Sequence, residues 1–216
     1  MSKSPKHIII ADDHAVVRTG LQLMLDETSD MSITGEANNG QELLDKLSKQ
    51  EYDLVVLDIS MPGKDALDVL KEIKAKWPEL PVAIFTMNPD DTHAKRMIRN
   101  GASAYINKET KASQVIEVLR IVSNGKKYFF PHQAEMLSEM VFFPERSNPE
   151  IHESLTDREF QIFFMLASGL KNAEISDKLA ISKNTISNHR NNILRKMKLS
   201  QNSELTRYAI QHGIIK

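Results

Sequence analysis

Cysteine is absent from the 216 residues, so this chain cannot form disulfides or bind a metal through thiolates. The seven histidines show no paired spacing such as His-Glu-x-x-His, which argues against a zinc hydrolase site. No apolar run approaches the roughly 20 residues that cross a bilayer. No secretory leader precedes the strand-like run Ile8-Ile9-Ile10. These absences predict a cytoplasmic protein with no membrane partner.

The net charge of −1 conceals an uneven distribution of charge. Residues 1–145 contain 17 Lys and Arg against 22 Asp and Glu, a balance of −5. Residues 146–216 contain 11 against 7, a balance of +4. An acidic part joined to a basic part indicates two functions, and nucleic acid is the candidate partner of the basic part.

The first part of the chain alternates between strand-like and helix-like segments. Apolar runs typical of strands occupy residues 7–11, 31–37, 54–57, 81–85 and 103–106. Amphipathic stretches typical of helices follow each of them, the clearest at 66–76 and 112–123. Such alternation predicts the α/β fold class, with a doubly wound five-stranded parallel sheet covered by helices on both faces.

The last part of the chain reads as helical throughout. Thr156 and Glu159 form a capping-box signature at the start of one helix, and Ser182 is a suitable N-cap for a helix over 183–197. Asn172 can cap a short helix between these two, and Asn202 or Ser203 can start a fourth. We therefore expect an α/β domain over 1–125, a linker over 126–153 that could contain a short helix at 131–141, and a small all-α four-helix domain over 154–216.

Polar side chains stand where the predicted strands of the first domain end. Asp58 follows the aliphatic run 54–57, and a carboxylate there cannot lie unpaired in the sheet interior. The other strand ends offer Asp12 and Asp13, then Thr86, then Lys108. The carboxyl ends of parallel strands meet at one edge of a doubly wound sheet, so these groups should lie together.

Three carboxylates in one pocket would raise one another's pKa values. A hard divalent cation with oxygen ligands relieves this repulsion, and Mg²⁺ (magnesium) typically takes one or two carboxylates, waters and a phosphate. A carboxylate beside such a cation can attack a phosphoryl group. Lys108 would then neutralise phosphoryl oxygens, and Thr86 would donate a hydrogen bond.

Residues 6 to about 125 resemble the receiver domain of two-component response regulators, which has a flavodoxin-like fold. The resemblance implies that Asp58 accepts a phosphoryl group from a sensor histidine kinase. It also implies that Asp13 binds Mg²⁺ directly and Asp12 through water, with the backbone carbonyl of Ser60 as a further ligand. By the same resemblance, Thr86 and Lys108 sense the phosphoryl group, and Tyr105 is the switch aromatic.

An aspartyl-phosphate hydrolase is the nearest enzymatic alternative. Its chemistry requires a second acid two residues after the nucleophile, where this chain has Ser60. We therefore expect slow self-dephosphorylation and no enzyme that turns over a separate phosphoester.

The helix expected over 183–197 has two contrasting faces. Ile186, Ile193 and Met197 fall on one side of the helical wheel and form a buried stripe. Residues 183–198 include five Lys or Arg and no acid, which suits the major groove of double-stranded DNA, where Asn pairs bidentately with adenine. The side opposite the stripe is entirely polar: Asn184, Ser187, Asn188, Asn191, Arg195 and Lys198.

Residues 155–214 resemble the LuxR-type helix-turn-helix of the NarL/FixJ subfamily of response regulators. The matching residues include Leu155-Thr156-x-Arg158-Glu159, Gly169-Leu170-x-Asn172 and Thr185-Ile186-x-x-His189. The resemblance implies base contacts by Ser187, Asn188 and Asn191. Candidates for phosphate contacts are Thr185, Arg190 and Lys196, and Lys183, Asn184 and Arg195 complete the predicted DNA-binding set.

Recognition helices of this kind read two half-sites, which predicts a homodimer in the active state. The last helix, with Leu205, Tyr208, Ala209 and Ile210, could form the self-contact or could belong to the core of its own domain. The sequence thus predicts a phosphorylation-controlled, DNA-binding transcriptional regulator. The alternative is a phosphate-accepting interaction module whose helical domain binds protein.

Overall fold

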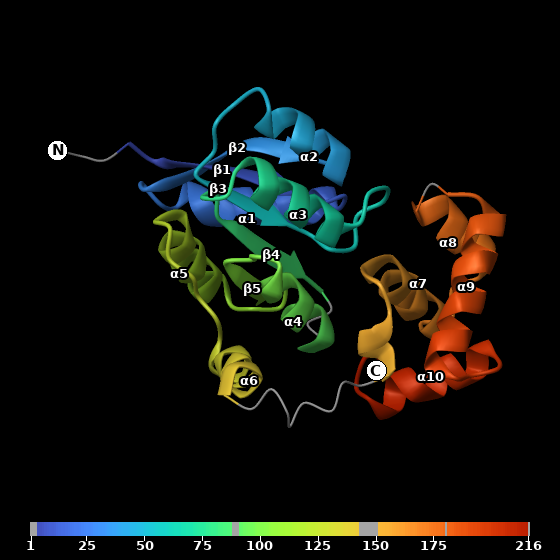
Figure 1. Ribbon diagram of the computed structural model, residues 1–216. Coiled ribbons are helices and arrows are strands. Elements are labelled where there is room, and N and C mark those ends of the chain that lie inside the picture. Colours follow the sequence, from blue (N-terminus) through green and yellow to red (C-terminus); the bar gives the residue numbers. More distant parts are fainter. Residues whose placement is uncertain (1–3, 88–90, 143–150, 180, 216) are drawn as a thin grey trace. The chain divides into compact units, whose positions relative to one another are not determined.

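The computed structural model describes residues 4–87, 91–142, 151–179 and 181–215. They form two compact units, the first extending to Ala134 and the second running from Glu135 onward. The first contains a central sheet with helices on both sides, and the second is helical (Figure 1).

The sheet has five parallel strands in the order β2-β1-β3-β4-β5, as expected for a doubly wound α/β domain. The direction of winding reverses between β1 and β3, so the carboxyl ends of these two strands flank a crevice. The bounds lie within one residue of those expected from the sequence: β1 (Lys6–Ala11), β2 (Met31–Ala37), β3 (Leu54–Leu57), β4 (Val82–Thr86) and β5 (Ala104–Asn107).

Five helices cover the sheet: α1 (Ala15–Asp26), α2 (Gly40–Leu47), α3 (Ala66–Lys76), α4 (Asp91–Arg99) and α5 (Ala112–Ser123). Helices α1 and α5 pack on one face, where Leu21 and Val118 join a shared apolar core. Helices α2 and α3 pack against each other, and a side chain at Gly40 would collide with Val69. Glycine at position 40 therefore permits the close approach of the two helices.

The segment that follows α5 packs against the first unit. The amide of Tyr128 donates to the carbonyl of Ser103 at 2.9 Å, and the rings of Tyr128 and Phe130 pack on the core under α1 and α5. Helix α6 (Pro131–Phe142) then begins, and Gln133 Nε2 donates to the carbonyl of Tyr105 at 2.9 Å. The early part of the expected linker is thus anchored to β5, and residues 143–150 of that linker lie outside the described residues.

The second unit contains a short 3-10 helix, η1 (Ile151–Ser154), followed by α7 (Asp157–Ala167), α8 (Asn172–Leu179), α9 (Lys183–Met197) and α10 (Asn202–Gln211). The predicted capping box is present, since Thr156 and Glu159 exchange side-chain-to-backbone hydrogen bonds. Ser182 caps α9 as expected, whereas Asn172 is the first residue inside α8 and not its N-cap. Among the described residues, no helix is long and apolar enough to cross a membrane.

Candidate functional site

Three strand ends bring their polar side chains together at the carboxyl edge of the sheet. Asp12 follows β1, Asp58 follows β3 and Lys108 follows β5, and each side chain is at least 96% buried. Lys108 Nζ lies 2.7 Å from Asp12 Oδ2 and 2.9 Å from Asp58 Oδ2. One lysine therefore bridges two carboxylates that the sequence separates by 46 residues.

One lysine charge cannot neutralise two carboxylates, so the pocket has an excess of negative charge. Burial raises the pKa of Asp58, and the neighbouring Asp12 adds to the effect, while Lys108 and the amide of Ser60 oppose it. In the described part of the chain, Lys108 is the only group that compensates Asp12 Oδ2 and Asp58 Oδ2. A second cation would therefore be bound favourably here.

Four potential ligand atoms in this pocket lie close enough together to hold that cation. Asp12, Asp13, His14 and Asp58 each offer one ligand atom, and these atoms all lie within 4.8 Å of one another. Ser60 lies two residues after Asp58, and its amide donates to Asp58 Oδ1 at 3.3 Å. The carboxylate set suits a hard divalent cation. His14 was missed in the sequence analysis, although its position directly after the Asp pair could have indicated it.

Thr86 and Tyr105 come from the two strands beyond β3. Both side chains are almost completely buried. The carbonyl of Thr86 accepts the amide of Lys108 at 2.8 Å, so the end of β4 fixes the backbone that carries the lysine. The carbonyl of Tyr105 accepts Gln133 Nε2 from α6. The predicted switch residue is therefore connected to the segment that leaves the domain.

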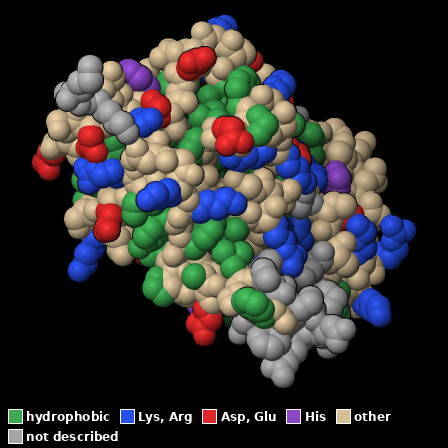
Figure 2. All heavy atoms as spheres, turned by 60° about the vertical axis from the view of Figure 1, so that its left-hand side comes forward, with side chains coloured by type: hydrophobic (Ala, Val, Ile, Leu, Met, Phe, Trp, Pro, Cys, Tyr) green, Lys and Arg blue, Asp and Glu red, His purple; other side chains and the backbone are tan. Residues whose placement is uncertain are grey.

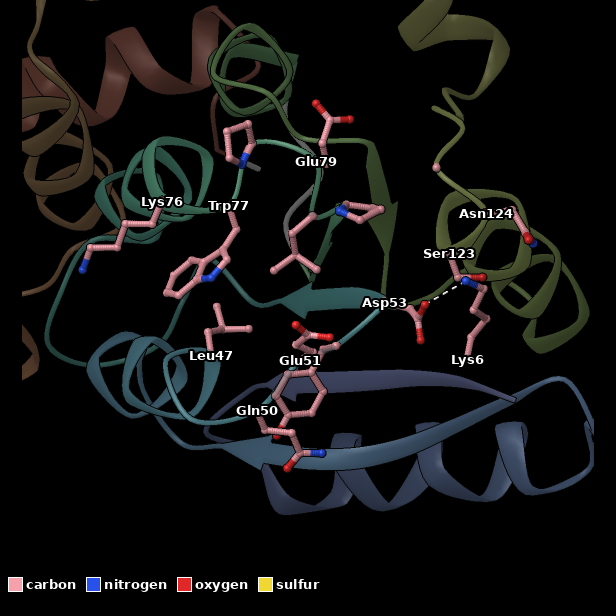
Figure 3. A pocket seen from close by; sticks show the side chains of 15 residues that line it. Lys6, Leu47, Gln50, Glu51, Asp53, Lys76, Trp77, Glu79, Ser123 and Asn124 are labelled. Carbon is pink, nitrogen blue, oxygen red and sulfur yellow. Dashed lines mark hydrogen bonds and ion pairs between the residues drawn. The ribbon is translucent and has the colours of Figure 1, made fainter. Parts of the chain in front are cut away.

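A pocket of about 770 Å³ lies at the opposite edge of the same sheet (Figure 3). It is lined by the ion pair of Lys6 with Asp53, at 2.7 Å, and by Trp77. None of the predicted site residues lines it. The face turned forward in Figure 2 shows acidic side chains as separate patches among hydrophobic and basic ones.

Helix α9 has the two faces that the helical wheel predicted. Ile186, Ile193 and Met197 are buried, as is Leu194. On the opposite side, Ser187 is half-buried and donates to the carbonyl of Lys183 at 3.0 Å. The exposed polar residues form a surface with positive charge and no acid: Lys183, Asn184, Asn188, Asn191, Arg195 and Lys198.

Other predicted DNA contacts are held by partners inside the same unit. Arg190 Nε donates to Asn202 Oδ1 of α10 at 2.7 Å, and Lys196 Nζ lies 2.6 Å from Glu159 Oε2 of α7. Thr185 shares a 2.8 Å hydrogen bond with the capping Ser182. Arg190 and Lys196 therefore tie α9 to α10 and α7, whereas the bond of Thr185 lies within the N-terminus of α9 itself.

Helix α10 contributes mainly to the core of its own unit. Leu205 and Ala209 are completely buried in that core, and Tyr208 shares a 3.0 Å hydrogen bond with His152 Nδ1 of η1. Of the four residues expected at a self-contact, Ile210 alone is exposed, with 54% of its surface accessible. The intradomain alternative therefore holds for Leu205 and Ala209.

Substituting Glu159 by Gln is expected to destabilise the helical unit by about 1–3 kcal/mol, since Gln can keep the capping hydrogen bond of α7 but leaves Lys196 without its carboxylate partner. Burial alone would raise the pKa of Glu159, but Lys196 and Thr156 together hold it below the ordinary value of 4.5. The stabilisation is thus fully present above that value and is lost as the pH falls through the lowered pKa.

Calorimetry of the full chain can measure this effect. The difference between wild type and Glu159→Gln should be largest near neutral pH and should shrink in acid, where the wild-type carboxylate is protonated. A difference that stays constant over the whole range would show that the ion pair contributes nothing.

Comparison with known proteins gives two family matches. Residues 8–120 match the response regulator receiver domain, and residues 153–209 match the bacterial regulatory proteins of the luxR family. The oxygen regulatory protein NreC of Staphylococcus carnosus is 33% identical over 213 residues, with 96% of this chain and 98% of the relative covered. The response regulator GacA of Pseudomonas viridiflava is 31% identical over 208 residues, covering 96% and 97%.

Solved structures show the same architecture. The response regulator RcsB of Salmonella typhimurium aligns with a TM-score of 0.73 at 23% identity, covering 97% of this chain and 99% of that one. The response regulator ChrA of a heme-sensing two-component system aligns with a TM-score of 0.53 at 28% identity, covering 99% and 100%. Given both family matches and the observed fold, this chain belongs to the NarL/FixJ-type response regulators, which join a receiver domain to a LuxR-type DNA-binding domain.

Proposed function

We propose that Asp58 is the phospho-acceptor and that its phosphorylation by a sensor histidine kinase controls DNA binding through α9. The observation that carries this proposal is the buried pair of Asp12 and Asp58 sharing one lysine at the edge of a receiver sheet. In the reaction, an oxygen of Asp58 forms a bond to phosphorus while the bond from phosphorus to the kinase histidine breaks. The departing imidazole keeps the electron pair of that bond.

The residues present fit a divalent cation, which we propose to be Mg²⁺. Asp12, Asp13 and Asp58 would hold it together with the backbone carbonyl of Ser60. When bound, it would supply positive charge to the phosphoryl oxygens. Once the cation neutralises the carboxylates, Lys108 would no longer be needed to neutralise both Asp12 and Asp58. It could then release one of them and bind a phosphoryl oxygen instead.

Thr86 and Tyr105 are proposed to report the phosphorylated state. Thr86 ends β4 beside the site, and its hydroxyl would donate to a phosphoryl oxygen. Tyr105 lies on the neighbouring β5, and its carbonyl is bound by Gln133. A shift of these two residues would therefore move the start of α6, which lies outside the receiver sheet.

The DNA-binding surface is proposed to be the exposed polar side of α9. Asn188, Asn191 and Ser187 would contact bases, as amide and hydroxyl groups can read the major groove. Phosphate contacts are assigned to the charged and polar residues Lys183, Asn184, Thr185, Arg190, Arg195 and Lys196. Because Arg190 and Lys196 are paired within the unit, their contribution would be to hold the orientation of the helix as much as to contact the backbone.

We further propose that residues 1–125 form the receiver domain, 126–153 the connection and 154–216 the DNA-binding domain. The active species would be a homodimer on double-stranded DNA, since recognition helices of this kind bind paired half-sites. The chain's own chemistry would be phosphoryl acceptance and slow self-dephosphorylation, without turnover of a separate substrate.

Gel-shift titration of wild type and Asp58→Ala tests the control of DNA binding. With a small phosphodonor and Mg²⁺ present, wild-type affinity for a DNA site selected from a random pool should change, while that of Asp58→Ala should not. Equal affinity of both proteins under both conditions would contradict the coupling. The alternative, a protein-binding helical domain, predicts that neither protein selects any DNA site.

A further inference from the structure

The backbone of Asp12 is hydrogen-bonded on both sides at the end of β1. Pairing of β1 with β2 ends at Ala11 and Ala37, and the amide of Asp12 still donates to the carbonyl of Ala37 at 3.0 Å. The carbonyl of Asp12 lies beyond this ladder in a buried residue, where an oxygen without a donor would be costly. Arg18 of α1 supplies the donor, because its Nη1 lies 2.7 Å from that oxygen.

The guanidinium of Arg18 is itself fixed by a second partner. Its Nε donates to Glu36 Oε2 of β2 at 2.6 Å, and only 14% of the Arg18 side chain is exposed. A guanidinium presents its donors in a rigid planar fork, so one group can hold two acceptors at set positions. We call this connection from Glu36 through Arg18 to the carbonyl of Asp12 the Arg18 bridge. It joins β2, α1 and the end of β1.

The Arg18 bridge acts on the acidic pocket through one peptide group. The carbonyl that Arg18 binds belongs to the planar peptide between Asp12 and Asp13, so its orientation sets the direction in which Asp13 leaves the chain. The carboxylate of Asp12 is held separately, since Oδ1 accepts the amide of His14 at 2.8 Å and Oδ2 pairs with Lys108 at 2.7 Å. Rotation of the peptide would therefore move Asp13 relative to a fixed Asp12 carboxylate.

We infer that Arg18 is a positioning residue of the phospho-acceptor site and holds Asp12 and Asp13 in the arrangement that a cation requires. This inference rests on the proposed function and adds a residue that is not itself a ligand. Loss of a group that holds a metal ligand in place typically lowers metal affinity by about 10- to 100-fold. Arg18 holds the backbone of the ligands and not their oxygens, so we expect a loss near the lower end, roughly 10-fold.

The alternative is that the guanidinium acts only through its positive charge, which repels a cation. In that case Arg18→Met would bind Mg²⁺ more tightly than wild type and Glu36→Ala more weakly. The double variant, which lacks both charges, would then bind Mg²⁺ about as wild type does. Positioning predicts a different pattern. All three variants should bind Mg²⁺ more weakly by a similar factor, because either substitution breaks the same bridge and the second adds nothing further.

Amide NMR titration of the full chain with MgCl₂ measures these affinities and verifies the fold of each variant. Arg18→Lys keeps the charge but replaces the fork by a single ammonium, so positioning predicts weaker Mg²⁺ binding and the charge alternative predicts no change. This variant also decides the question if Arg18→Met does not fold. Arg120→Met is the matched control: Arg120 Nε pairs with Asp30 Oδ2 at 2.5 Å at the opposite end of β2, and its loss should leave Mg²⁺ affinity unchanged.

Phosphorylation by acetyl phosphate gives a second readout, which a purely structural role would not produce. In Arg18→Lys the Mg²⁺ concentration that gives half the maximal rate should rise roughly 10-fold, while the rate at saturating Mg²⁺ should match that of wild type.

Unchanged or tighter Mg²⁺ binding in either Arg18 variant, an equal loss in Arg120→Met, or a fall in the maximal rate alone would overturn the inference. In each of these cases wild type would still bind Mg²⁺ and accept a phosphoryl group on Asp58. A wild-type protein that does neither would overturn the proposed function and the inference together.

Discussion

Asp58→Asn is expected to abolish phosphorylation by acetyl phosphate completely. The substitution keeps the shape of the side chain but removes the nucleophilic carboxylate, and no second acid stands beside it on the same strand end. Intact-mass spectrometry should show one added phosphoryl group on wild type in the presence of Mg²⁺ and none on the variant. The folded state should survive, because Lys108 keeps its 2.7 Å ion pair with Asp12.

Asp53→Asn is the matched control for this experiment. Asp53 and Asp58 flank the same strand, β3, at its two ends. Asp53 is only partly buried, and although burial acts to raise its pKa, Lys6 and the amide of His7 bring it below the ordinary value. This carboxylate is thus fully satisfied and far from the acidic pocket, so its substitution should leave the phosphoryl mass in place. A phosphoryl group that persists on Asp58→Asn would refute Asp58 as the acceptor.

The double substitution Asn188→Ala and Asn191→Ala is expected to remove specific DNA binding. Both side chains are exposed on the side of α9 opposite its buried stripe. Each bidentate contact with a base contributes about 1–3 kcal/mol, so losing two should weaken binding by roughly 30-fold or more. Fluorescence anisotropy with a labelled site selected by the wild type measures the loss, and circular dichroism verifies the fold.

Gln211→Ala provides the control for the second experiment. Gln211 is an exposed amide at the end of α10, in the same helical unit but on a different helix. Its substitution should leave both DNA affinity and helicity unchanged. If the double variant of α9 binds the selected site as tightly as Gln211→Ala does, α9 is not the reading helix and the protein-binding alternative gains support.

The secondary structure followed closely from the sequence. The strand over 54–57 and the helix over 66–76 begin and end as expected, because apolar periodicity and capping depend on neighbours along the chain. The capping box of Thr156 with Glu159 was predictable for the same reason. Even the buried and exposed sides of α9 could be assigned from a helical wheel, since one stripe must face a core.

Local patterns could not predict which side chains distant in the sequence would pair with each other. The sequence places a lysine at one strand end and acids at two others, and only the packed sheet shows that Lys108 holds Asp12 and Asp58 together. The pairs of Lys196 with Glu159 and of Arg190 with Asn202 likewise join separate helices. Apolar periodicity could mark Leu205 and Ala209 as buried, but only the structure places them in the core of their own unit.

The sequence by itself therefore determined the order of the elements, the acidic strand ends and the polar face of α9. The tertiary structure decided which charges meet, which predicted DNA contacts are already paired, and that His14 faces the acids. The physical reason is the distance along the chain over which each interaction acts. Backbone preference and side-chain periodicity act over a few residues, whereas an ion pair between distant segments depends on how whole layers pack.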